Sequence, residues 1–372
     1  MLPTDSAEAI LVGRVLLPAG PTPVVIRGGT IHDVSAVAPT VADLLDLADP
    51  ASATGPVVGS LDDLIAGNGP ELLSPVDLQC VKACGVTFAV SAIERVIEER
   101  ARGDADKASA IRGDLEAKVG SGIRSTVPGT PEAAALKAAL IEAGMWSQYL
   151  EVAIGPDAEV FTKAPVLSSV GWGADIGVRS DSDWNNPEPE VVLIVDKSGK
   201  ARGATLGNDV NLRDFEGRSA LLLGKAKDNN ASTSLGPFIR LFDGKFTMDD
   251  VRQAEIDLVI DGPEGYQLTG HSSMNQISRD PEDLVRQALS EHQYPDGFAL
   301  FLGTLFAPIQ DRDIPGRGFT HRDGDVVKIA TPKLGALVNR VTTSKAAAPW
   351  TFGIRELMRN LASRGLLEGT GA

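Results

Sequence analysis

Two glutamates open an apolar run in residues 184–195, WNNPEPEVVLIV. Alternate residues of a β-strand point to the same face, so this spacing predicts that Glu188 and Glu190 converge. Two further carboxylates, Asp209 and Asp214, follow in the segment GNDVNLRD, and either could join the two glutamates. Three carboxylates without a histidine form a hard-oxygen site, which prefers Mg²⁺, Mn²⁺ or Ca²⁺ to zinc or copper. The alternative is a solvated strand end, with Pro189 protecting a sheet edge.

Two lysines, Lys225 and Lys227, lie at the end of a second apolar run, GRSALLLGKAKD. A lysine beside a metal and an apolar wall can act as a base or bind a carboxylate. The alternative is a pair of lysines exposed to solvent, which is the usual environment of this residue type.

The composition argues against several classes of function. The chain has 372 residues and a formal net charge of -15, which is unfavourable for binding nucleic acid or anionic membranes. Its four histidines lack HxH and HExxH spacing, which weakens a zinc site. There is no GxSxG elbow, and GWGADIG is predicted to be a loop rather than a dinucleotide fingerprint. An anionic substrate would therefore need a local cation or metal.

The cysteines and the apolar runs indicate the compartment. Cys80 and Cys84 have a spacing that suits one face of a helix, and nothing indicates a disulfide framework. The first residues do not form a signal peptide, and no apolar stretch approaches the length of a membrane span. We expect a cytoplasmic protein with no membrane partner.

The elements that position these residues change along the chain. Residues 1–75 mix short strand-like runs with a helix-like run and predict a small N-terminal α/β domain. The remainder, 76–372, is predicted to be one domain with a helical entry segment at 76–150, then a mostly β region, and a C-terminal helix at 349–367. Helices and strands do not alternate regularly, which argues against a doubly wound sheet.

The order of several segments resembles the fumarylacetoacetate hydrolase superfamily: EPEVVLIV, GATLGNDVNLRD, LLLGKAKD, LGPF, ALFLGTLFAP and GDVVKIATPKLGALVNRV. This resemblance implies an α+β, mainly β fold, a mixed β-sandwich or roll with a small N-terminal domain and flanking helices. It also implies a homodimer or homotetramer. The apolar face of the last helix could form a subunit interface or cap its own domain.

The resemblance also implies roles for individual residues. The family's metal ligands for Mg²⁺ or Mn²⁺ correspond to Glu188, Glu190 and Asp209. Three further residues match family motifs, namely Lys225 in LLLGKAKD, Lys163 in VFTKAP and Thr304 in LFLGTLFAP.

One segment departs from the hydrolases of this superfamily. They carry a histidine and a glutamate that activate water, whereas GVTFAVSAIERVIEER has Ser91 at the histidine position and keeps Glu94. A serine is not a base near neutral pH without a partner. Ser91, Glu94 and Glu98 fall on one side of the predicted helix, which faces either the metal cleft or solvent.

The departure resembles the sugar-acid dehydratase branch, the bacterial 2-keto-3-deoxy-D-xylonate dehydratases, over nearly the whole chain. It implies conversion of a 2-keto-3-deoxypentonate to 2,5-dioxopentanoate in D-xylose catabolism. In that reaction we expect Lys225 to be the base or enolate partner and Glu94, with Ser91, to be the acid. The expected substrate-binding residues are Lys163, Thr304, Lys227 and Glu98. The alternatives are a hydrolase of 2,4-diketo acids and a non-catalytic oligomeric binding protein.

Overall fold

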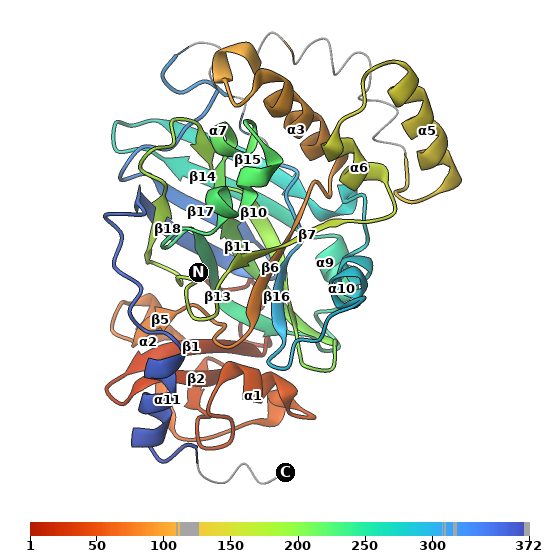
Figure 1. Cartoon of the computed structure of the whole chain (residues 1–372). Coiled ribbons are helices and arrows are strands. Elements are labelled where there is room, and N and C mark those ends of the chain that lie inside the picture. The colour runs from red at the N-terminus through yellow and green to blue at the C-terminus, as the bar shows by residue number, and fades with distance from the viewer. Residues whose placement is uncertain (109–110, 112–125, 307, 309, 315–317, 368–372) are drawn as a thin grey trace.

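Two β-sheets pack face to face in the computed structural model, which describes residues 1–108, 111, 126–306, 308, 310–314 and 318–367 (Figure 1). The larger sheet has eleven strands, in the order β4 (Val57–Ser60), β3 (Thr30–Asp33), β2 (Gly20–Arg27), β1 (Leu11–Leu17), β13 (Thr233–Leu241), β11 (Ala201–Asp209), β10 (Pro189–Val195), β16 (Phe298–Phe301), β6 (Cys80–Gly85) and β7 (Glu159–Ala164), with β5 (Glu71–Leu73) also paired to β1. The smaller sheet has five, in the order β15 (Gln267–Ser273), β14 (Glu255–Asp261), β17 (Val326–Thr331), β18 (Gly335–Thr343) and β8 (Asp175–Val178). A short pair joins β9 (Asn185–Asn186) to β12 (Asn211–Leu212).

Helices flank the two sheets. They are α1 (Val41–Asp46), α2 (Leu61–Ile65), α3 (Ala89–Ala101), α5 (Pro131–Glu142), α6 (Gln148–Ile154), α7 (Arg213–Glu216), α8 (Leu223–Lys227), α9 (Met248–Arg252), α10 (Pro281–Leu289) and α11 (Ile354–Ser363), with 3₁₀ turns at Pro50–Ser52, Ala220–Leu222 and Met274–Gln276. Helices α3, α5 and α6 gather at one end of the molecule (Figure 1), where Ile93 and Ile97 of α3 share a core with Leu150 of α6.

Strand β10 shows how the sequence builds this sandwich. Its side chains alternate between two cores because successive residues of a strand point to opposite faces. Val191 and Leu193 pack with Leu258 of the smaller sheet, whereas Val192 packs with Leu44 of α1 on the other side. The α+β, mainly β sandwich expected from the sequence is therefore confirmed.

The N-terminal strands continue the larger sheet. β1 pairs antiparallel with β13, opposite Ile239 and Arg240. The buried guanidinium of Arg240 also donates to both carboxylate oxygens of Asp5, at 2.6 and 2.7 Å. Residues 1–75 thus share a hydrogen-bonded sheet with the segment that follows, and the predicted domain boundary at residue 75 does not interrupt that sheet.

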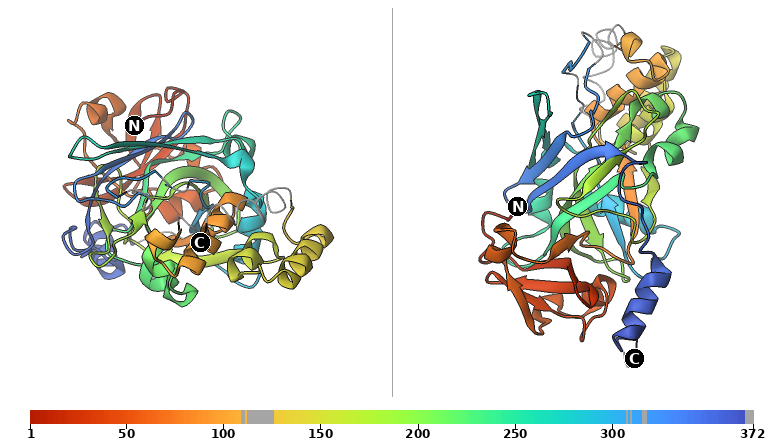
Figure 2. Two further views of the ribbon diagram at one scale, coloured as in Figure 1. Left: turned by 90° about the horizontal axis from the view of Figure 1, so that it is seen from above. Right: turned by 90° about the vertical axis from the view of Figure 1, so that its left-hand side faces the viewer.

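The C-terminal helix lies beside the N-terminal strands (Figure 2). Asn360 donates a hydrogen bond to the carbonyl oxygen of Ala19 at 2.8 Å. Leu357 is buried on this chain, whereas Met358 is exposed. Of the two roles left open for the apolar face, the inward side caps its own chain. The homodimer or homotetramer stays a prediction.

The predicted helical segment at residues 76–150 is wrong at its start. Cys80 and Cys84 lie on strand β6, which runs parallel to β16 and antiparallel to β7. Cys80 pairs with Phe298, and no local pattern can reveal a partner so distant in sequence. Helices α3, α5 and α6 confirm the helical character farther along. The predicted helical stretch at 109–110 and 112–125 falls outside the described residues.

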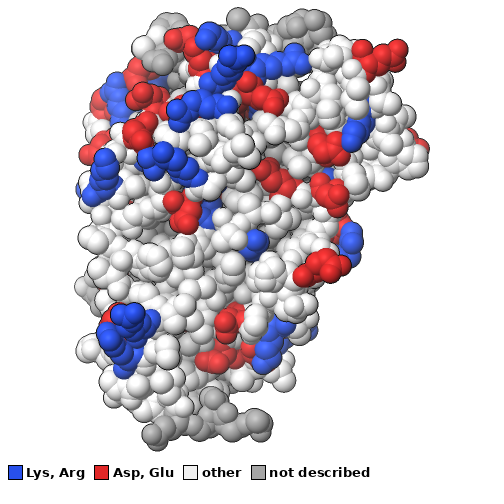
Figure 3. All heavy atoms as spheres, in the orientation of Figure 1, with Lys and Arg blue, Asp and Glu red and all other residues white. Residues whose placement is uncertain are grey.

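Charges of both signs are interspersed on the face shown in Figure 3. The net charge of -15 is therefore not gathered into a single acidic patch on that face. Within the described part of the chain, no helix combines the length and the apolar character that crossing a membrane requires.

Candidate metal and active site

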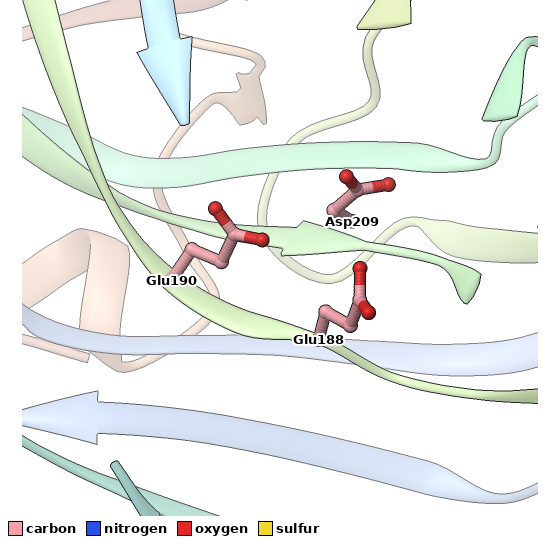
Figure 4. A group of neighbouring side chains, drawn as sticks. All are labelled: Glu188, Glu190 and Asp209. Carbon is pink, nitrogen blue, oxygen red and sulfur yellow. The ribbon is translucent and has the colours of Figure 1, made fainter. Parts of the chain in front are cut away.

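Three buried carboxylates converge where β10 begins and β11 ends (Figure 4). Antiparallel pairing places Glu190 opposite Gly207, so the end of β11 brings Asp209 beside the two glutamates. One oxygen from each of Glu188, Glu190 and Asp209 lies within 4.8 Å of the others. These three residues, called the carboxylate triad below, offer three oxygen ligands to one ion.

Two cationic side chains contact the triad. Lys227 Nζ lies 2.8 Å from Glu188 Oε2 and 3.2 Å from Asp209 Oδ2. Arg95 Nη2 lies 3.0 Å from Glu188 Oε1. A fourth carboxylate, Glu216, binds both cations, at 2.5 Å from Arg95 Nη1 and 3.4 Å from Lys227 Nζ. Lys227 and Arg95 thus each pair with Glu216 as well as with the triad, so their positive charge does not neutralise the triad alone.

The electrostatics of the cavity favour an additional cation. Burial raises the pKa of Glu190, and the charges of Asp209 and Glu188 raise it further. The pKa of Glu188 is also raised, mainly by burial, although Lys227 and Arg95 oppose this rise. The described residues lining the cavity include seven carboxylates and three cationic side chains. A donor set of carboxylate oxygens fits Mg²⁺ or Mn²⁺, and a divalent charge there would lower these pKa values.

Of the two lysines predicted for the site, Lys225 as base and Lys227 as a substrate-binding residue, only Lys227 lines the cavity. Lys225 is exposed, its Nζ lies 5.7 Å from the centre of the Phe215 ring, and it does not line the cavity. Lys227 is buried and does line the cavity. Burial lowers the pKa of Lys227, but the three surrounding carboxylates raise it more, so its pKa lies well above that of free lysine. Lys227 is therefore a cation in this arrangement.

Lys163 lies behind the triad rather than in the cavity. Its side chain is fully buried, and its Nζ donates to the carbonyl oxygens of Lys227 at 2.5 Å and Ser232 at 3.0 Å. The same Nζ lies 3.1 Å from Asp209 Oδ1. The predicted contact between Lys163 and substrate is therefore replaced by a structural role, because these contacts fix the orientation of Asp209.

The polar face of α3 lines the cavity, which decides between the two orientations left open for it. Ser91 donates its hydroxyl hydrogen to the carbonyl oxygen of Thr304, a residue that also lines the cavity. Arg213 of α7 binds Glu94 at 3.0 Å and Glu98 at 2.7 Å. Burial raises the pKa of Glu98, but Arg95 and Arg213 lower it more. Glu98 is thus held as a carboxylate.

Sequence reasoning missed four charged residues of the cavity, namely Arg95, Glu159, Arg213 and Glu216. Burial raises the pKa of Glu159 more than Arg95 lowers it, and Glu216 raises it further. Glu159 therefore takes up a proton more readily than an ordinary glutamate. The sequence feature that could have identified Glu159 is the segment EVFTK, because Glu159 lies on the same strand as Lys163. Arg95 adjoins Glu94 in the predicted helix, and Arg213 and Glu216 lie in the segment NLRDFE.

A family model matches residues 134–342, and its description is "Fumarylacetoacetate (FAA) hydrolase C-terminal". The 2-dehydro-3-deoxy-D-arabinonate dehydratase of Saccharolobus solfataricus is 31% identical over 49% of this chain and 58% of its own length. A Haloferax volcanii protein named "Probable 2-keto-3-deoxyxylonate dehydratase" is 30% identical over 54% of this chain and 66% of its own length. The chain thus matches less than two thirds of either relative.

Solved structures share the fold over most of the chain. The apo form of a 2-keto-3-deoxy-D-arabinonate dehydratase has a TM-score of 0.66 at 23% identity, covering 90% of this chain and 99% of its own. A structure described as the same enzyme with magnesium and 2,5-dioxopentanoate has a TM-score of 0.64 at 22% identity, with the same coverage.

Proposed function

Because the chain belongs to the fumarylacetoacetate hydrolase family, we propose that it is a metal-dependent dehydratase of a 2-keto-3-deoxypentonate. The products would be 2,5-dioxopentanoate and water, formed in oxidative pentose catabolism. The names of the two sequence relatives and the magnesium in the related structure support this proposal. Mg²⁺ is the proposed cofactor, with Mn²⁺ as a substitute that shares its ligands.

The observation that carries the proposal is the chemistry of the cavity. It holds the carboxylate triad and Lys227, yet none of its described lining residues is a histidine. At the position where hydrolases of the superfamily carry the water-activating histidine, Ser91 donates its hydroxyl to a backbone carbonyl. The cavity is therefore suited to a metal-assisted elimination and lacks the usual base for hydrolysis of a carbon–carbon bond.

The metal site would be formed by Glu188, Glu190 and Asp209, and a bound divalent ion would make the C3 protons of a 2-keto acid more acidic. Lys227, held as an ammonium group by its carboxylate neighbours, would balance negative charge that develops on the C2 oxygen. The carboxyl groups on the surrounding walls would orient the hydroxyl groups of the substrate.

Glu159 is the proposed proton-transfer group, because its raised pKa makes its carboxylate a stronger base than usual. Glu159 would remove a proton from C3 and deliver it to the C4 oxygen, which leaves as water while the C3–C4 double bond forms. The resulting enone has a hydroxyl on C5, and proton shifts convert it to the aldehyde. In this scheme Glu159 replaces both Lys225 as base and Glu94 with Ser91 as acid.

The test uses protein stripped of metal with EDTA and both C4 epimers of 2-keto-3-deoxypentonate, with and without Mg²⁺. We expect 2,5-dioxopentanoate in the NMR spectrum only when Mg²⁺ is present. A Glu190→Gln variant should give no aldehyde at the same Mg²⁺ concentration. If neither epimer yields the aldehyde, the proposed reaction is rejected. Cleavage of a 2,4-diketo acid by the same sample would identify a hydrolase instead.

A further inference from the structure

Two hydroxyl groups near the start of α3 bind consecutive parts of the loop that follows β16. Thr87 Oγ1 donates to the carbonyl oxygen of Leu302 at 2.7 Å. Ser91 Oγ donates to the carbonyl oxygen of Thr304. Thr87 is 1% exposed, so its hydrogen bond is shielded from water. Thr87 directly precedes the N-cap of α3, and Ser91 lies in its first turn.

The other side of each peptide group is also bound. The carbonyl of Leu302 shares a peptide group with the N–H of Gly303, which donates to Glu190 Oε2 at 2.6 Å. The carbonyl of Thr304 shares a peptide group with the N–H of Leu305, which donates to Ser272 Oγ of the smaller sheet at 3.1 Å. Because C=O and N–H point in opposite directions in a trans peptide, a donor on the carbonyl directs the N–H.

Gly303 allows this close arrangement. Its φ of +92° lies in the left-handed region, and a Cβ atom built on it would lie 2.0 Å from Thr87 Oγ1. A side chain at this position would therefore displace either the hydroxyl of Thr87 or the peptide that it holds. The Thr87 hydroxyl, the Leu302–Gly303 peptide and the Glu190 carboxylate form one continuous hydrogen-bonded chain.

We propose that Thr87 is a positioning residue for the metal site, acting through the Leu302–Gly303 peptide on the ligand Glu190. The hydroxyl of Thr87 fixes the rotation of this peptide and polarises its N–H, which holds one oxygen of Glu190 and leaves the other to face the triad. The inference rests on the metal site of the proposed function but not on its substrate.

The test compares Thr87→Val, which keeps the shape and removes the hydroxyl, with Thr87→Ser, which keeps the hydroxyl. Mn²⁺ binding to the apoprotein is measured by electron paramagnetic resonance and calorimetry. We expect Thr87→Val to weaken Mn²⁺ binding by about tenfold, the lower end of the usual effect of a residue that orients a metal ligand, and Thr87→Ser to keep it within about threefold. If Thr87→Val does not fold, Thr87→Ala takes its place.

Thr22→Val is the matched control. Thr22 is also fully buried and donates to a backbone carbonyl, that of Gly20 at 3.0 Å, but it lies on β2. Unchanged Mn²⁺ binding in Thr87→Val would overturn the inference, as would an equal loss in Thr87→Ser or Thr22→Val. If the wild-type protein binds Mn²⁺ but forms no aldehyde, the proposed substrate is rejected. The role of Thr87 is then still tested by the same Mn²⁺-binding comparison.

Discussion

Lys225 and Lys227 are separated by one residue, yet only Lys227 contacts the carboxylate triad. Residues two apart on a helix point in nearly opposite directions, because each residue turns the helix by about 100°. Helix α8 has only five residues, and its rotation is fixed by the burial of Ala226 and Lys227. The sequence therefore predicts a lysine in the site but cannot show which of the two it is.

The two lysines give a matched pair of variants. Lys227→Met should lower kcat/KM by at least about 100-fold, because a positioned charge or proton-transfer group usually contributes that much. Lys225→Met should change it less than about twofold, since an exposed side chain outside the cavity makes no catalytic contact. Steady-state kinetics with Mg²⁺ decide the matter. Equal losses in both variants would contradict the assignment.

Glu159→Gln tests the proposed proton transfer. The amide keeps the shape of the side chain but cannot accept a proton from C3, so we expect kcat to fall by about 100-fold or more with a smaller change in KM. Mn²⁺ binding should stay near the wild-type value, because Glu159 is not part of the triad. A variant with wild-type kcat would exclude Glu159 as the proton-transfer group.

The triad could be predicted because each of its residues lies near a recognisable strand end. Glu188 and Glu190 follow the alternation of a strand, and Asp209 was added by the resemblance of its segment to a family. Arg95, Glu159 and Glu216 could not be predicted in the same way. They come from α3, β7 and α7, and only the assembled sheet and helices bring their charges together.

Helices α3 and α7 are joined by a buried ion pair network. Arg213 binds Glu94 and Glu98, which are one turn apart on α3, and its guanidinium lies 4.4 Å from the centre of the Trp184 ring. All three charged side chains are buried. Removing a central cation from such a network leaves carboxylates without compensation, which costs more than breaking an exposed pair.

Arg213→Met should therefore lower the free energy of unfolding by about 3 kcal/mol or more. Arg218→Met is the control, because Arg218 is exposed and its contacts are local: it lies over the Phe215 ring and donates to the carbonyl oxygen of Asp214 at 3.1 Å. Its loss should cost less than about 1 kcal/mol. Urea unfolding followed by circular dichroism measures both. Equal stabilities of the two variants would show that the network between α3 and α7 does not hold the helices together.

At the level of elements, the sequence predicted best where neighbours in the chain are neighbours in space. The strands β17 and β18 follow one another and pair directly, and they lie in the region predicted to be mostly β. Strand β6 was missed because its partners β16 and β7 are distant in sequence. Its residues CVKACG then carry no pattern that distinguishes a central strand from a short helix.

Two histidines give the whole molecule opposite dependences on pH. Burial lowers the pKa of His321 more than its contact with Asp325 raises it. The unfolded chain then binds this proton first as the pH falls below about 6.5, so the stability contributed by neutral His321 is lost toward acid pH. The hydrogen bond with Asp257 is the main cause that raises the pKa of His271, so its contribution is lost as the pH rises.

Urea unfolding at pH 5 and pH 8 separates these effects. His321→Gln should cost more stability at pH 8 than at pH 5, because only the neutral ring is accommodated. His271→Gln should cost more at pH 5, by a smaller amount, since His271 is half exposed and its charges are screened. If both variants lost more stability at the same one of the two pH values, the opposite pKa shifts of the two histidines would be contradicted.

The pairing of β1 with β13 has a consequence for any fragment of this protein. A chain starting at residue 76 would contain the whole carboxylate triad, but the backbone groups of β13 that bind Leu11 and Val12 would be left without partners. Uncovered strands of this kind recruit strands from other molecules. We therefore expect the fragment 76–372 to aggregate during size-exclusion chromatography, because the N-terminal strands would no longer shield β13 from self-association.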